Sequence, residues 1–222
     1  MGNITADDFQ VKSAKTIPHS KRRNRATSLE KKLATEVSTL QTTYPEAEIQ
    51  LWCEDEHRLG LKPILRRVYV PEGFVPIANV NWRYQWLWLY AFVHPKTGET
   101  YWWILPYVNT ELFNKVLADF AAQFNLGANK HVLLAVDGAG WHTSKNLQIP
   151  LGLHLTFLPP YSPELQPAER LWTLVDEPIA NRSFDTLDDL EEVLFHRCQS
   201  LLKQQDLIQG LTGFHWWTKI GV

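Results

Sequence analysis

The order of strand-like and helix-like segments along the chain is the feature that most limits its fold. A strand pattern at residues 48–55 and an aromatic hairpin pattern at 84–106 come before a helical pattern at 109–124. Two more apolar strand segments follow, at 130–137 and 153–159. Because such a mixture buries its apolar faces best in layers, we predict an α/β fold with a central mixed β-sheet flanked by helices.

Further helices are expected on either side of these segments. Residues 27–45 read as a helix with Thr27 or Ser28 as its cap, ended by Pro45. Residues 186–205 read as a long helix whose acidic first turn suits the helix dipole. Between the first strand and the aromatic hairpin, residues 66–80 are expected to form two short strands joined by a turn at Glu72–Gly73.

The pattern divides the chain into three parts. We predict an irregular basic arm at residues 1–26, a linker helix at 27–44 and one large α/β domain at 45–222. Residues 12–32 carry eight Lys and Arg against one Glu, although the whole chain has a net charge of −2. Such a segment can hold phosphates, or it can be a solvated tail, and its composition allows both interpretations.

Composition excludes several classes of protein. No apolar run reaches the length of about 18 residues that a membrane span requires, and the start of the chain lacks the pattern of a signal peptide. The two cysteines, Cys53 and Cys198, do not form a disulfide framework. We therefore expect a cytoplasmic protein, associated with the nucleoid if its partner is DNA.

Three predicted elements end in, or begin with, a carboxylate. Asp55 lies at the end of the first strand, Asp137 follows a buried strand, and Glu169 is the third residue of a helix that we expect to begin at Pro167. If the strands are neighbours, the three carboxylates converge and repel one another unless cations lie between them. Hard oxygen ligands suit Mg²⁺ or Mn²⁺, and we expect two ions.

Each carboxylate also has a simpler interpretation. Glu169 fits a helix-capping glutamate, and Asp137 fits a turn residue that accepts backbone hydrogen bonds. In "EDE" at residues 54–56, Glu54 and Glu56 point to the opposite strand face from Asp55, because side chains alternate along a strand. Asp55 shares its face with apolar residues, so a purely surface role suits it poorly.

Three blocks of sequence carry a resemblance to a known family. These are "LWCEDEHRLGLKP" (51–63), "LLAVDGAGWHTS" (133–144) and "LTFLPPYSPELQPAERLW" (155–172). They resemble the three blocks of the DDE transposases of bacterial insertion sequences, in the mariner-related superfamily. The last block is the most specific, since residues 158–169 match the family pattern nearly throughout.

The resemblance implies a ribonuclease-H-like fold and a metal-dependent enzyme that cleaves and transfers DNA strands. It implies that Asp55, Asp137 and Glu169 are the catalytic metal ligands and that Glu164 is a loop residue. His142, Arg58 and Lys62 are then candidates for contact with substrate. His142 can instead pack in the turn, and the two basic residues can belong to a solvated face. Tryptophans near the blocks can stack on bases, but strand alternation favours packing for most.

The chain also departs from the family pattern in two ways. Asp137 and Glu169 are closer in sequence than is usual, and residues 145–152 replace a connecting helix that Pro150 would break. No segment before residue 27 is long or regular enough for the helix-turn-helix module that finds transposon ends. We therefore expect the catalytic part alone, with DNA as partner and either a homodimer or a helix-turn-helix-bearing partner.

Two other functions remain open at this point. The chain could be a ribonuclease-H-like nuclease that cleaves without joining strands. It could also be an inactive remnant or regulator that binds DNA or a full-length transposase.

Overall fold

The computed structural model describes residues 19–75, 77, 81–214 and 216–220, and these contain one mixed five-stranded sheet. The strands lie in the order β3-β2-β1-β4-β5. β2 is antiparallel to β1 and β3, whereas β4 is parallel to β1 and β5. The strands are β1 (Glu48–Gly60), β2 (Trp86–His94), β3 (Glu99–Leu105), β4 (Lys130–Val136) and β5 (Leu153–Phe157). This architecture confirms the predicted α/β class.

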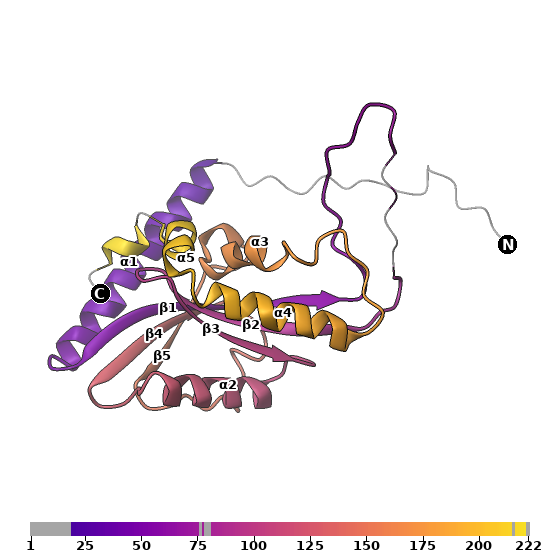
Figure 1. Cartoon of the computed structure of the whole chain (residues 1–222). Coiled ribbons are helices and arrows are strands. Elements are labelled where there is room, and N and C mark those ends of the chain that lie inside the picture. Colours follow the sequence, from indigo (N-terminus) through magenta and orange to yellow (C-terminus); the bar gives the residue numbers. More distant parts are fainter. Residues whose placement is uncertain (1–18, 76, 78–80, 215, 221–222) are drawn as a thin grey trace.

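Helices cover both faces of the sheet, as Figure 1 shows. On one face, α2 packs on aromatic residues of the strands, including Trp52 and Phe92. The opposite face carries the larger core, which α1, α3, α4 and α5 cover. The helices are α1 (His19–Thr43), α2 (Thr110–Gln123), α3 (Trp172–Val175), α4 (Leu187–Leu201) and α5 (Gln205–Thr212), with short 3₁₀ turns at Pro163–Leu165, Ala168–Leu171 and Trp217–Lys219.

The helices expected at residues 109–124 and 186–205 are present, and each has a capped start. Asn109 caps α2, because its side chain accepts a hydrogen bond from the Leu112 amide. Thr186 and Asp189 form a reciprocal capping box at the start of α4. Residues 137–152, which join β4 to β5, form turns and no helix, as the sequence indicates. No described helix is long and apolar enough to cross a membrane.

The start of the first helix is predicted wrongly. α1 begins at His19 rather than at Thr27 or Ser28, so the last part of the expected irregular arm is helical. Extending an existing helix adds one hydrogen bond per residue and needs no new nucleus, so a basic segment continues it readily. The rest of the arm, residues 1–18, lies outside the described residues.

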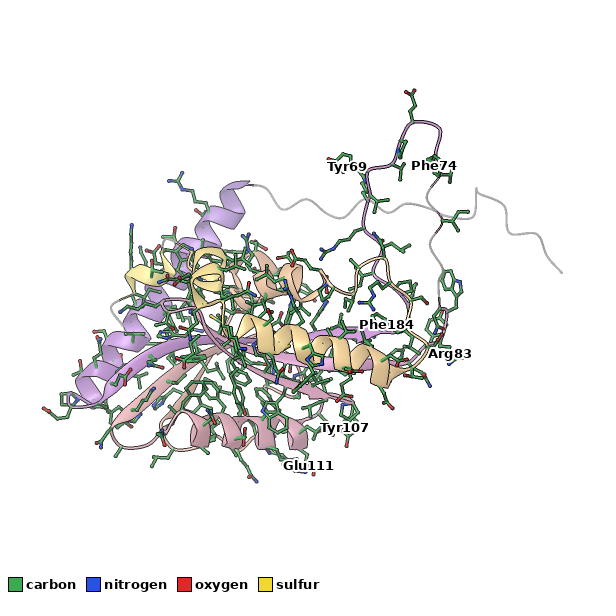
Figure 2. The ribbon with its side chains drawn as sticks, viewed as in Figure 1. Tyr69, Phe74, Arg83, Tyr107, Glu111 and Phe184 are labelled. Carbon is green, nitrogen blue, oxygen red and sulfur yellow. The ribbon has the colours of Figure 1, made fainter. Side chains whose placement is uncertain are left out.

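The prediction of two short strands within residues 66–80 is also wrong, because the described part of that segment contains no strand. The expected turn is present, because the Phe74 amide donates to the Pro71 carbonyl. The flanking residues are irregular, and Tyr69 and Phe74 project away from the sheet (Figure 2). An isolated hairpin is only marginally stable in water, and this loop has no surface on which to bury an apolar face.

Side-chain hydrogen bonds hold the base of this projecting loop to the segment before α4. Asn81 donates to the Phe184 carbonyl at 2.7 Å and Arg83 to the Asp185 carbonyl at 3.1 Å. On the other limb, the Arg66 amide donates to Asn181 at 2.8 Å. The loop therefore leaves the body from a fixed base, as Figure 2 shows for Arg83 and Phe184.

Candidate active site

Asp55 and Asp137 lie on neighbouring parallel strands. Cys53 of β1 is aligned with Ala135 of β4, so that two residues further on Asp55 and Asp137 reach the same level of the sheet. Asp137 follows the last residue of β4, as predicted. β1 does not end near Asp55 as expected but continues to Gly60, paired with β2. Asp55 therefore sits on a rigid strand rather than on a loop.

The third block brings Glu169 to these two residues. Gln166 donates a 2.8 Å hydrogen bond to the Glu54 carbonyl, which fixes the block against β1. Pro167 has helical dihedral angles, and the 3₁₀ turn Ala168–Leu171 that follows it carries Glu169. This turn has no side-chain capping hydrogen bond, which argues against the capping interpretation of Glu169. The helical start is thus where the sequence places it, although the helix is short.

All three carboxylates line one cavity of about 450 Å³. Its remaining walls come from the turn after β4 and from the proline-rich loop at residues 158–163, and Gln166 closes one side. Glu164, the other acidic residue of the block, is not among its lining residues. The predicted convergence of Asp55, Asp137 and Glu169 is therefore present in the fold, and their catalytic and metal-binding roles are taken up below as proposals.

The environment of Asp55 disfavours its charge. Burial, together with the nearby Glu169 carboxylate, raises the pKa of Asp55 to about 8. The Trp172 indole donates a 3.0 Å hydrogen bond to Asp55 Oδ2, which favours the ionised form and fixes the carboxylate. Burial also raises the pKa of Glu169, with a contribution from Asp137. A cation bound between Asp55 and Glu169 would stabilise the ionised form of both carboxylates.

Asp137 is held in place by its own turn and by a histidine. Its Oδ1 accepts a hydrogen bond from the Ala139 amide at 2.9 Å and another from His142 Nδ1 at 2.8 Å. The His142 hydrogen bond, with help from that of Ala139, lowers the pKa of Asp137. The turn interpretation of Asp137 is therefore correct, and it coexists with a place in the cavity.

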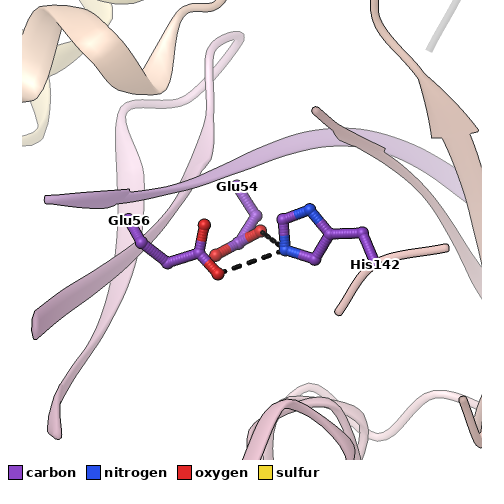
Figure 3. Close-up of side chains that lie close together, drawn as sticks. All are labelled: Glu54, Glu56 and His142. Atoms are coloured by element: carbon purple, nitrogen blue, oxygen red, sulfur yellow. Dashed lines mark hydrogen bonds and ion pairs between the residues drawn. The ribbon is translucent and has the colours of Figure 1, made fainter. Parts of the chain in front are cut away.

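His142 is buried on the far side of Asp137, where it meets two more carboxylates (Figure 3). Its Nε2 lies 3.1 Å from Glu56 Oε1 and 3.5 Å from Glu54 Oε2. The Trp141 indole also donates to Glu56 Oε1, at 2.7 Å. Both ring nitrogens thus face protein carboxylates, and the residue as a whole is only 1% exposed. This placement favours a positioning role over the substrate contact considered from the sequence.

Glu54, Glu56 and His142 have ligand atoms within 4.8 Å of one another, a spacing that one metal ion could also bridge. A proton on the imidazole is sufficient to explain it. Burial alone would lower the pKa of His142, but its hydrogen bonds to Asp137 and Glu56 and the nearby carboxylate charges raise that pKa to about 11. Burial likewise raises the pKa of Glu54, aided by Glu56. An imidazolium between carboxylates therefore balances this cluster without a metal.

The two basic residues proposed for substrate contact lie away from the cavity. Arg58 stacks its guanidinium over Trp86 and Trp88, at 5.2 and 5.9 Å from the ring centroids. Lys62 lies 5.4 Å from the ring centroid of Trp82, near the base of the projecting loop. Both are exposed, and neither lines the cavity of the three carboxylates.

Sequence reasoning missed four residues that shape the site. Gln166 and Trp172 hold β1 and Asp55, and only their positions in the third block hint at that role. Tyr161 lines the cavity, is 88% exposed and has φ of 55°, which is unusual for a residue other than glycine. Arg25 of α1 donates to the Ser162 hydroxyl at 3.2 Å, so the basic helix reaches the cavity rim.

Comparison with known proteins identifies the family of the chain. A sequence model of the family described as DDE superfamily endonuclease matches residues 50–191. The uncharacterized protein y4pE/y4sA of Sinorhizobium fredii (strain NBRC 101917 / NGR234) is 36% identical over 122 residues, which are 54% of this chain and 87% of that protein.

Solved structures of the Mos1 transposase have a similar fold. The mariner Mos1 paired end complex with Mg has a TM-score of 0.56 at 19% identity, over 99% of this chain and 66% of that one. The pre-cleavage Mos1 transpososome also has a TM-score of 0.56, at 15% identity over 96% and 68% of the two chains. These likenesses confirm the ribonuclease-H-like fold. Because the family match spans more than half of the sequence, the chain belongs to the DDE superfamily endonucleases.

Proposed function

We propose that this protein is the catalytic domain of a transposase, which cleaves DNA strands and joins them to a target with Asp55, Asp137 and Glu169 as its metal ligands. The observation that carries the proposal is the convergence of these three carboxylates, from three separate elements, on one cavity. The family match supports an endonuclease, and the Mos1 complexes with transposon-end DNA support the transposase class.

The donor set suits Mg²⁺ or Mn²⁺. All three side chains offer hard oxygen atoms, and the pKa values of Asp55 and Glu169 are raised first by burial and then by a neighbouring carboxylate. When bound, a pair of such ions stabilises both the attacking and the leaving oxygen of a phosphodiester during in-line displacement. Mos1 has been solved with Mg and with Mn, which supports the same choice here.

The protein's own contribution is to hold the ligands in place. Trp172 fixes one oxygen of Asp55, and Ala139 and His142 engage Oδ1 of Asp137, which leaves Asp137 Oδ2 to a cation. Gln166 keeps the turn that carries Glu169 against β1. Such supporting hydrogen bonds define ligand orientation and so tune metal affinity.

DNA would reach the cavity past the proline-rich loop and the exposed part of α1. Arg25 of α1 bonds to this loop, and Lys32 donates to the Phe157 carbonyl just before it, at 2.8 Å. Positive charge beside the cavity suits a phosphate backbone. We assign the recognition of transposon ends to a helix-turn-helix-bearing partner.

The proposal is tested with two DNA substrates and the whole chain. Nicking of a supercoiled plasmid in Mg²⁺ or Mn²⁺ reports cleavage, and joining of a pre-cut end to a target plasmid reports strand transfer. We expect both reactions, and we expect Asp137→Asn to lose both. Mn²⁺ binding measured by calorimetry should also fall in that variant. Equal binding by Asp137→Asn and the unchanged protein would contradict the metal assignment.

Two outcomes would change the function assigned. Cleavage without joining, with transposon ends supplied, would indicate a nuclease of the same fold. Intact Mn²⁺ binding without either reaction would indicate an inactive relative that retains its site.

A further inference from the structure

The outer side of β3 forms a second surface, separate from the cavity. β3 lies at one edge of the sheet, and no strand among the described residues pairs with its outer side. A groove of about 650 Å³ runs along this edge, lined by six consecutive residues, 99–104. An edge strand offers a row of backbone donors and acceptors to any extended chain that lies beside it.

The groove has exposed apolar side chains on one of its walls. In Figure 1, α4 lies on one face of the sheet and α2 on the other, and the groove is lined by residues of α4 and of the end of α2. α4 buries Leu190, Leu194 and Leu201 in the core. Phe195 of α4 and Leu202, just after its end, line the groove instead. Phe195 is 51% exposed and Leu202 is 47% exposed. Large apolar side chains exposed together beside an open strand edge indicate a binding surface.

The charge of the groove has a single sign. Glu99 and Glu191 line it, and none of the described lining residues is Lys or Arg. A shallower hollow of about 360 Å³ shares Glu191 and Phe195 with the groove and adds Asp188 and Glu192. Complementary potential across an interface selects its partner. A basic partner is favoured here, and a nucleic acid, whose phosphates would be repelled, is not.

We propose that this groove binds an extended, basic peptide segment of a protein partner, which adds to β3 as a sixth strand. Its backbone pairs with residues 99–104, and its side chains alternate between the two sides of the extended sheet. On the side of α4, apolar side chains of the peptide pack on Phe195 and Leu202. On the side of α2, its basic side chains reach Glu99, which alternates with Thr100 along β3. The site goes beyond the proposed catalytic function, because β3 is two strands away from β1 and its Asp55.

The test uses the whole chain and three labelled seven-residue peptides. One alternates Lys and Val, one alternates Glu and Val, and one carries a central Pro in the Lys-Val sequence. Fluorescence polarisation measures binding, and hydrogen exchange by mass spectrometry follows the amides of β3. We expect the Lys-Val peptide to bind at least about tenfold more tightly than the other two, a difference of about 1.4 kcal/mol. It should also slow exchange at residues 99–104.

Two variants locate the contact. Glu99→Lys should weaken binding of the Lys-Val peptide by about tenfold and improve binding of the Glu-Val peptide. Glu46→Lys is the matched control, because Glu46 is exposed at the turn between α1 and β1, and it should change neither. Both variants should nick plasmid like the unchanged protein.

The proposal is overturned by equal binding of the Lys-Val and Glu-Val peptides, by the absence of binding, or by binding that leaves β3 exchange unchanged. It is also overturned if β3 becomes protected without peptide as the protein concentration rises. That result would make a second copy of this chain the occupant.

Discussion

The acidic residues on the two faces of β1 have opposite surroundings. Asp55 points into the cavity, where Glu169 repels it and Trp172 supplies a single side-chain hydrogen bond. Its sequence neighbours Glu54 and Glu56 point to the other face, where His142 lies between them. On the cavity face, burial and Glu169 disfavour the charge of Asp55, while on the other face a buried imidazolium lies beside the two glutamates. A site for an external cation needs the first arrangement, and a rigid support for that site needs the second.

The largest effect is expected from the carboxylates of the cavity. Glu169→Gln should reduce metal-dependent nicking by at least about 1,000-fold, because loss of a metal ligand removes several kcal/mol of transition-state stabilisation. Glu164→Gln is the matched control in the same block and should retain most activity, since Glu164 does not line the cavity. If Glu164→Gln is the inactive variant, the third block has been interpreted wrongly.

On the enclosed face, the expected effect is on stability. Glu56→Ala leaves the Trp141 indole and the His142 imidazolium without their shared acceptor. Breaking a buried pair of this kind costs about 3 kcal/mol, which denaturant unfolding should show. Glu111→Ala removes an exposed ion pair with Lys115 at the start of α2 and should change the free energy of unfolding far less than Glu56→Ala does. Equal losses in both variants would contradict the distinction between the two faces.

The link between the faces runs through His142. His142→Gln should lower Mn²⁺ affinity by about 10- to 100-fold, as expected for a group that orients a metal ligand. Calorimetry gives the affinity, and circular dichroism shows whether the fold is intact. His154→Gln, which alters a histidine pair remote from the cavity, serves as the control and should bind Mn²⁺ normally. Unchanged Mn²⁺ affinity in His142→Gln would show that the cluster around His142 does not affect metal binding in the cavity.

The smallest effect is expected from Asp55 in metal-free protein. Its pKa is about 8 in the fold, above the ordinary value of 3.8, so the folded state holds the proton that the unfolded state loses. The free energy of unfolding should therefore fall as pH rises from about 4 to 8. Asp55→Asn should remove part of this fall and stabilise the protein by about 1 kcal/mol at pH 8 in EDTA.

In added Mn²⁺ the unchanged protein should become more stable than Asp55→Asn, because only the unchanged protein gains stability from the ion. A variant that is less stable than the unchanged protein in EDTA would show that the cavity carboxylates do not repel one another.

The sequence by itself assigns Asp55 and its two glutamate neighbours to opposite faces of β1, because the side chains of a strand alternate regardless of context. The apolar segments likewise determine the strands, and Pro167 marks the turn that carries Glu169. These features depend on a few neighbouring residues. They are sufficient to predict the strands of the sheet and its class, whereas the choice of Asp55, Asp137 and Glu169 also depended on the resemblance to a known family.

Tertiary structure alone decides what surrounds those carboxylates. The hydrogen bonds of Trp172 to Asp55 and of Gln166 to the Glu54 carbonyl join residues more than a hundred positions apart, and no local pattern specifies them. The same holds for the enclosure of His142 by β1 residues. The irregular loop near Tyr69 likewise depends on packing, because a hairpin without a surface to cover does not form. α1 extends to His19 because adding residues to an existing helix needs no new nucleus.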